Sequence, residues 1–219
     1  NMGWMHDFLE YMKLDPYFRK YNHTKMNFAM VYAYSENYML VLSHDEVVHL
    51  KCSMIEKMPG SYEEKFKNLM AGYAFMTGHP GKKLLFMGQD FGQHREWSEE
   101  RELDWFLLEK EPNHQLQLFV KELLHLYKSN KCLYEYDCWP EGFEWINADD
   151  GDRSIFSFVR HSASGKNNML FVINFTPVER PDYRVGTTCR RKHTLVLNSD
   201  DKKFGGKGKR RPKEYKPVK

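Results

Sequence analysis

The feature that most constrains the fold is a short apolar run, Met39 to Leu42, which stops abruptly at the polar cluster Ser43 to His49. An apolar run of this length between polar residues is typical of a buried strand. A strand buried on both faces is typical of a parallel sheet covered by helices, where chemistry lies at the strand ends. The pattern therefore predicts a strand that delivers His44 and Asp45 to a site. Spacing alone is equally consistent with two residues that cap the next helix.

A second unit of the same kind follows. Ser61 to Glu64 has the pattern of a capping box, and apolar residues then recur at helical spacing as far as Gly78 and Pro80. Another apolar run, Leu84 to Met87, stops at the polar stretch Gly88 to Gln93. Two strand–loop–helix units with polar loops at the same end favour a (β/α) barrel.

The remaining segments before residue 130 are expected to be loops and helices. Residues 1–7 show little periodicity and predict a loop that follows an earlier strand. The chain starts without the character of a domain start, so we expect barrel strands to precede it. Helices are predicted at Phe8–Met12, Lys25–Tyr34 and about Asn113–Ser129.

After residue 130 the helical periodicity gives way to short strand-like runs separated by turns rich in Asp, Gly, Ser and Asn. Regular spacing of this kind favours an antiparallel sandwich. We therefore place a domain boundary near residue 130, dividing the chain into 1–130 and 131–219. The basic stretch 202–219 is expected to be a solvated sandwich loop, disordered in isolation, rather than a nucleic-acid-binding tail. The predicted strands are 143–147, 154–160, 169–174 and 193–198.

Composition excludes several classes of function. The net charge of +3 does not demand an acidic partner such as nucleic acid, and no apolar run is long enough to span a membrane. The four cysteines lack the paired spacing of zinc sites, no other metal-ligand spacing occurs, and a reduced, cytoplasmic protein fits best.

Four stretches resemble the 1,4-alpha-glucan branching enzymes of the alpha-amylase family. Leu42 to His49 resembles their long motif around a His-Asp pair, and Trp4 to Asp7 resembles the segment after their sixth barrel strand. Pro80 to Gly88 resembles the eighth strand, and Asn174 to Val178 resembles the C-terminal sandwich. The resemblance implies the C-terminal part of a (β/α)8 TIM barrel, about strands six to eight, followed by an incomplete all-β sandwich domain.

The resemblance also implies a reaction and its residues. Such an enzyme cleaves an α-1,4 glucan segment with retention and transfers it to a 6-hydroxyl, making α-1,6 branches in glycogen or starch. Asp45 would stabilise the transition state, His44 and Trp4 would bind substrate, and Glu46 and His49 would support the loop. The nucleophile and the acid/base carboxyl would lie outside this chain, which is then expected to be inactive and aggregation-prone alone. Neither cofactor nor metal is implied.

The resemblance leaves alternatives and one departure. An inactive glucan-binding relative, or another hydrolase or transferase of the same family, would share these motifs. The parent protein is expected to be monomeric and cytoplasmic, or plastidic in a plant. Leu50 stands where the family usually has glycine, so a positive φ at this position would strain the loop.

Overall fold

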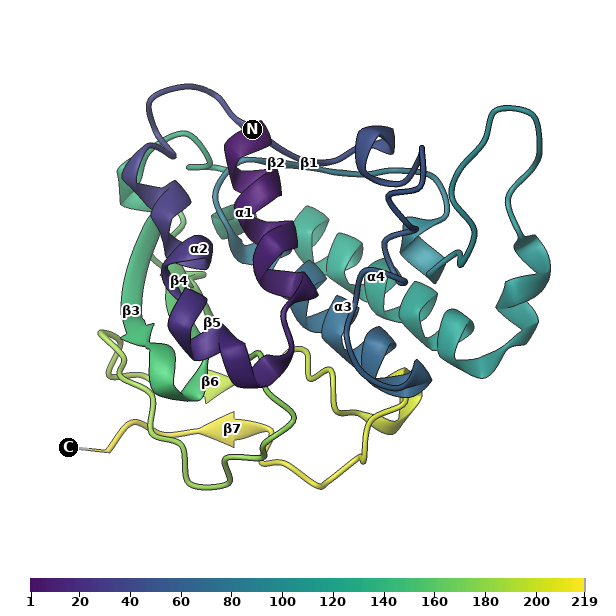
Figure 1. Ribbon diagram of the computed structural model, residues 1–219. Helices are drawn as coiled ribbons and strands as arrows, with labels where there is room; N and C mark the ends of the chain where they lie inside the picture. The colour runs from purple at the N-terminus through teal and green to yellow at the C-terminus, as the bar shows by residue number, and fades with distance from the viewer. Residues whose placement is uncertain (219) are drawn as a thin grey trace.

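The structure is a computed structural model that describes residues 1–218. Helices occupy most of the first 130 residues, and after them the regular elements are mainly short strands joined by turns and loops (Figure 1). The α-helices and β-strands are α1 (Met2–Lys13), α2 (Thr24–Asn27), β1 (Met39–Leu42), α3 (Tyr62–Gly78), β2 (Lys82–Leu85), α4 (Glu111–Ser129), β3 (Phe143–Asp150), β4 (Ile155–Arg160), β5 (Met169–Asn174), β6 (His193–Thr194) and β7 (Glu214–Tyr215). Short 3₁₀ helices include η1 (Pro16–Asn22), η2 (Phe28–Val31), η3 (His44–Glu46), η4 (Gln89–Phe91), η5 (Trp105–Glu109) and η9 (Lys202–Phe204).

Strands β1 and β2 form a parallel pair, joined by a connection that contains α3. This confirms the predicted strand at 39–42 and its parallel partner. The predicted burial on both faces is wrong, because β1 buries only Leu40 and Leu42 and every residue of β2 is exposed or half-buried. The second strand begins two residues earlier than predicted, at Lys82, and ends at Leu85. It starts directly after Gly81, whose φ of +100° and close approach to the Tyr38 carbonyl oxygen set the turn into the strand. Gly88 then closes the turn that follows, again at positive φ.

Helix α3 follows its sequence signals closely. Ser61 and Glu64 form the predicted capping box, and the helix ends at Gly78 as expected. Its buried face carries Phe75, whose ring lies 5.6 Å from that of Phe156 in β4. Helix α3 therefore packs against the C-terminal sheet.

Helix α1 replaces the loop that the sequence predicted for residues 1–7. The Asn1 side chain accepts a hydrogen bond from the Trp4 backbone N–H at 2.9 Å and caps the helix. Because this cap starts the helix at Met2, Trp4 and Met5 join Phe8 on the buried face. The predicted helix at 25–34 is real but irregular, since α2 passes into η2 after four residues.

Strands β3, β4 and β5 form an antiparallel sheet in that order, close to the predicted bounds. The predicted strand at 193–198 is shorter, because β6 pairs with β7 over two residues only. A single cluster of buried apolar side chains runs from α1 and α3 through this sheet to Phe204. Residues on both sides of position 130 therefore share one core.

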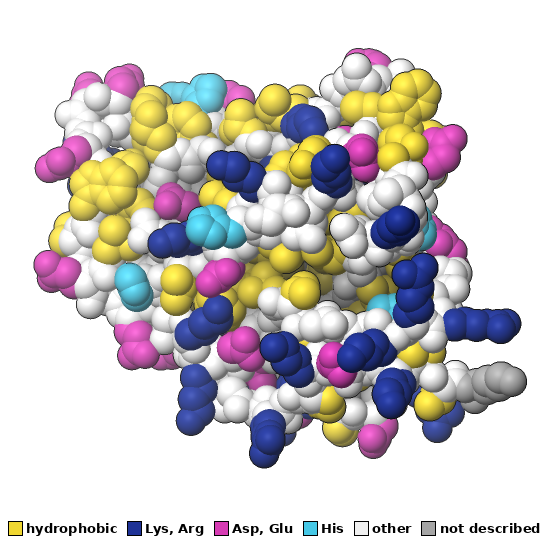
Figure 2. Space-filling model, turned by 180° about the vertical axis from the view of Figure 1, so that it is seen from behind, with side chains coloured by type: hydrophobic (Ala, Val, Ile, Leu, Met, Phe, Trp, Pro, Cys, Tyr) yellow, Lys and Arg dark blue, Asp and Glu magenta, His cyan; other side chains and the backbone are white. Residues whose placement is uncertain are grey.

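The basic stretch is attached to the rest of the chain. Phe204 is buried against Phe119 of α4, with ring centroids 5.0 Å apart, and Lys209 pairs with Glu179 at 2.5 Å. These contacts attach the segment to the rest of the chain, and the expected disorder of the isolated stretch stays a prediction; Lys219 lies outside the described residues. Lys and Arg side chains gather over the lower part of the face in Figure 2, where this segment lies. None of the helices described has the length and apolarity that a membrane crossing requires.

Candidate functional site

His44 and Asp45 directly follow the carboxyl end of β1, in the single turn η3. Both side chains face solvent, with 53% and 56% of their surface exposed. The Ser43 hydroxyl donates to Asp45 Oδ2 at 3.0 Å, and His44 Nε2 lies 3.4 Å from Asp45 Oδ1. The arrangement presents an oriented carboxylate beside an imidazole at the end of a parallel strand, where a ligand can reach both.

The loop after this pair contains one buried carboxylate, that of Glu46. Glu46 is buried, and its carboxylate lies 3.4 Å from Lys51 Nζ. The same ammonium group donates to the Asp45 carbonyl oxygen at 2.8 Å. Lys51 therefore ties the strand end to the far side of the loop, whereas the His49 side chain remains exposed.

The loop backbone adopts a left-handed conformation at three residues. His49, Leu50 and Cys52 have φ values of 56°, 64° and 67°. Leu50 therefore has the positive φ that strains a residue other than glycine, and its side chain is 96% exposed. Glu96 stabilises this backbone, because its carboxylate accepts hydrogen bonds from the Leu50 N–H at 3.0 Å and the Cys52 N–H at 2.6 Å.

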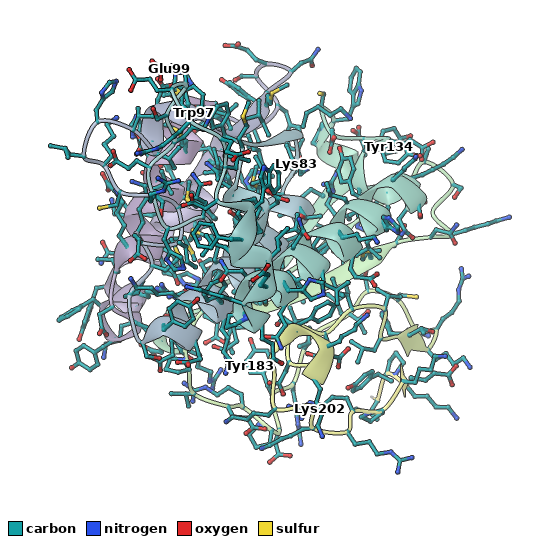
Figure 3. All side chains as sticks on the ribbon, turned by 90° about the vertical axis from the view of Figure 1, so that its right-hand side faces the viewer. Lys83, Trp97, Glu99, Tyr134, Tyr183 and Lys202 are labelled. Atoms are coloured by element: carbon teal, nitrogen blue, oxygen red, sulfur yellow. The ribbon has the colours of Figure 1, made fainter. Side chains whose placement is uncertain are left out.

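Two aromatic rings pack beside the imidazole of His44. Phe86, just after β2, lies 5.7 Å from it, and Trp97 lies 6.3 Å from it at an interplanar angle of 71°. The Trp97 backbone N–H also donates to the Val47 carbonyl oxygen at 3.0 Å. Figure 3 places Trp97 at the edge of the molecule near Glu99. Sequence reasoning gave neither Glu96 nor Trp97 a role, since each contacts residues more than forty positions away.

Trp4 does not belong to this site, and its predicted role in sugar binding is wrong for this structure. Only 2% of the residue is exposed. Its ring stacks on Phe8 at 4.8 Å and lies 6.1 Å from the ring of His79. A tryptophan buried to this extent on α1 has no free face for a glucose ring.

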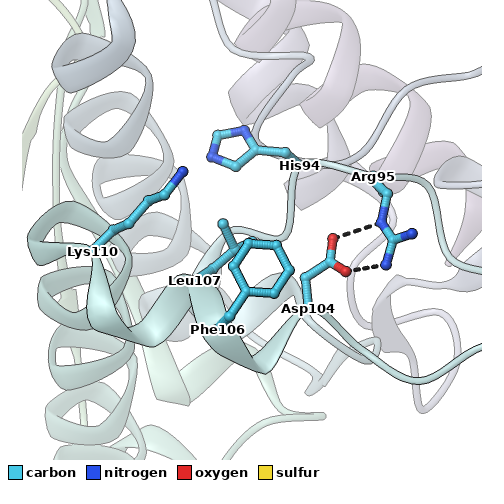
Figure 4. A pocket seen from close by; sticks show the side chains of 6 residues that line it. All are labelled: His94, Arg95, Asp104, Phe106, Leu107 and Lys110. Atoms are coloured by element: carbon cyan, nitrogen blue, oxygen red, sulfur yellow. Dashed lines mark hydrogen bonds and ion pairs between the residues drawn. The ribbon is translucent and has the colours of Figure 1, made fainter.

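An open hollow of about 490 Å³ lies in the segment between η4 and the start of α4 (Figure 4). The Arg95 guanidinium is engaged by Asp104 through two hydrogen bonds, one of them from Nε to Oδ2 at 2.7 Å. Lys110 reaches toward His94 across the hollow. The walls are formed by His94, Arg95, Asp104, Phe106, Leu107 and Lys110, so neither His44 nor Asp45 contributes.

An ionic cluster around the buried side chains of Asp137 and Arg160 lies at the other end of β2 from the loop that follows it. Asp137 accepts from Arg160 at 2.8 Å and from Lys82 at 3.0 Å, and Arg160 also donates to the Gly78 carbonyl oxygen. Burial lowers the pKa of Lys83 to about 7, an effect that Asp137 opposes and Arg160 adds to. This cluster joins α3 and β2 to β4 and stabilises the junction. Among residues 1–218 no group of three or more His, Cys, Asp or Glu side chains is placed to hold a metal.

Comparison with known proteins gives one consistent relationship. Residues 145–219 match the model of the alpha amylase C-terminal all-beta domain. The 1,4-alpha-glucan branching enzyme GlgB of Butyrivibrio fibrisolvens is 58% identical over 219 residues, which are 100% of this chain and 34% of that protein. GlgB of Aquifex aeolicus is 51% identical over 95% of the chain and 33% of its own length, and GlgB of Halothermothrix orenii is 49% identical over 96% and 33%.

The chain thus spans about a third of the length of the curated relatives that it matches. The resemblance found in the motifs extends along the whole chain at high identity. By sequence, the chain is a relative of the 1,4-alpha-glucan branching enzymes of the alpha-amylase family, and it includes their C-terminal all-beta domain.

Proposed function

We propose that this chain forms part of a 1,4-alpha-glucan branching enzyme, which cleaves an α-1,4 glucan segment with retention and transfers it to a 6-hydroxyl. In this proposal residues 1–130 complete the (β/α)8 barrel and residues 131–219 form the C-terminal sandwich domain. The observation that carries the proposal is the exposed, oriented Asp45 carboxylate directly after a parallel strand, with His44 beside it. The names of the relatives support the same substrate class.

Asp45 would act on the transition state. Cleavage of a glycosidic bond passes through an oxocarbenium-like state, in which positive charge develops at the anomeric carbon. A carboxylate already held by Ser43 can stabilise that charge and bind sugar hydroxyls without reorganising at the moment of reaction. The His44 imidazole, fixed by Phe86 and Trp97, would donate to a hydroxyl of the same sugar.

The remaining parts of the reaction are assigned to other regions. Retention needs a nucleophilic carboxylate and an acid/base carboxyl about 5–5.5 Å apart. We place both on earlier strands of the barrel, outside this chain, and give neither role to Glu46, Asp90 or Asp104. Glu46 is buried against Lys51, and Asp104 is bound to Arg95, so both carboxylates already have partners. Glu46 and His49 would support the loop.

The experiment is incubation of the intact protein with amylose, followed by separate counts of α-1,6 linkages and of new reducing ends. A branching enzyme increases α-1,6 linkages while the number of reducing ends stays constant, because each cleaved segment is transferred. A rise in reducing ends without α-1,6 linkages would instead identify a hydrolase. No change in either count, together with glucan binding and an unchanged distribution of chain lengths, would identify an inactive relative. A changed distribution of chain lengths would instead identify a transferase that forms α-1,4 bonds.

A further inference from the structure

The loops that follow β1 and β2 are joined at two points by consecutive residues. The Trp97 N–H holds the Val47 carbonyl oxygen, and the Glu96 carboxylate holds the amides of Leu50 and Cys52. We call Glu96 and Trp97 together the clamp. It contacts the segment that begins at His44 in its middle, at Val47, and at its far end, at Leu50 and Cys52. Glu96 is half-buried, and each of its carboxylate oxygens accepts one of these bonds.

The two amides that donate to Glu96 lie on either side of Lys51, whose side chain donates to the Asp45 carbonyl oxygen after β1. Leu50 and Cys52 both have positive φ, a conformation that costs L-residues roughly 1–2 kcal/mol and needs support from its surroundings. Between them, Lys51 donates to the Asp45 carbonyl oxygen at 2.8 Å and lies 3.4 Å from the Glu46 carboxylate. A continuous set of contacts thus runs from Glu96 through the left-handed turn and Lys51 to the backbone of Asp45.

We propose that Glu96 is a positioning residue for Asp45: its carboxylate fixes the turn at residues 50–52, and Lys51 then holds the strand end. This inference rests on the proposed function for its catalytic consequence. The proposed role of Glu96 runs through the backbone, because each of its carboxylate oxygens accepts a hydrogen bond from an amide of the turn. A misplacement of about 1 Å at a catalytic group can lower a rate roughly a hundredfold, so loss of the clamp should reduce turnover.

The test compares Glu96→Ala with Glu96→Gln and with the matched control Glu99→Ala, an exposed glutamate on the same loop. We expect Glu96→Ala to lower kcat for amylose branching about tenfold to a hundredfold with KM within about twofold, because an effect confined to the transition state lowers kcat alone. Glu96→Gln keeps one acceptor oxygen and should fall between Glu96→Ala and the unchanged Glu99→Ala. A KM effect alone, or a kcat equal to that of the control, would overturn the proposal.

A double variant tests the route through Lys51. If Glu96 acts on Asp45 by way of that side chain, Glu96→Ala combined with Lys51→Met should be no slower than the worse single variant. Multiplication of the two losses would show that they act separately and would contradict the inference.

Hydrogen exchange separates this inference from the proposed function. In the intact protein, Glu96→Ala should accelerate exchange in the peptide that covers residues 44–52, and Glu99→Ala should not. Unchanged exchange overturns the positioning role whether or not the wild type branches amylose. A wild type that forms no α-1,6 linkages, with faster exchange in Glu96→Ala, would overturn the proposed function while leaving the clamp established.

Discussion

Replacing Leu50 by glycine should stabilise the protein. Leu50 has a φ of 64°, and its side chain is 96% exposed, so its removal gives up almost no buried apolar surface. The left-handed conformation costs an L-residue roughly 1–2 kcal/mol. Glycine avoids that cost but loses roughly 0.5–1 kcal/mol more conformational entropy on folding. The middle values of these two ranges leave a net gain of about 0.75 kcal/mol in the free energy of unfolding.

Urea unfolding followed by tryptophan fluorescence measures this gain as a higher midpoint with an unchanged slope. In a melting experiment the shift should be about 1–4 °C for a chain of this size. Leu124→Gly provides the control, because Leu124 is also exposed but lies within α4, where glycine costs about 1 kcal/mol. If both glycine variants were destabilised to the same extent, the backbone argument for Leu50 would be refuted.

Three further predictions concern the buried junction and are read from urea unfolding. Gly78→Ala should cost about 1–3 kcal/mol, because the added Cβ would lie 2.7 Å from the Phe158 ring; an unchanged midpoint would contradict this packing. Arg160→Met should cost about 3–5 kcal/mol by leaving Asp137 buried without its main partner, and Asp137→Leu added to it should restore part of that loss; no recovery would count against the ion pair as the cause. Burial lowers the pKa of His79 from 6.5 to about 3, so the unfolded chain takes up the proton first and stability falls as pH drops from 6.5 toward 3. His79→Gln should remove that part of the pH dependence, and equal slopes for the two proteins over this window would rule out His79 as its source.

Local patterns predicted the part of the fold that carries the site. The apolar run before His44 gave the strand, and the capping box at Ser61 gave the start of α3. Both signals lie within a few neighbouring residues, so burial and hydrogen bonding of those residues decide the outcome. The parallel pairing of the strands followed from the helix between them.

Side-chain contacts between distant segments were not predicted from the sequence, although the pairing of the two parallel strands was. Trp4 was predicted to lie at the rim of a site, but packing against Phe8 and His79 buries it. Glu96 supports the turn at 50–52 from 44 and 46 positions away, and nothing in its immediate neighbours marks that partnership. The positive φ of Cys52 was missed for the same reason, since only the folded loop imposes it.

The measurement that tests the central claim most directly is the turnover of the intact protein carrying Asp45→Asn, determined as α-1,6 linkages formed from amylose per unit time. The amide keeps the shape of the side chain and removes its charge. Turnover should fall by several orders of magnitude while binding of the glucan is largely retained, because charge at this position would stabilise the transition state more than the bound substrate. Turnover close to that of the wild type, in a variant that unfolds at the same urea concentration, would show that Asp45 does not have the role proposed.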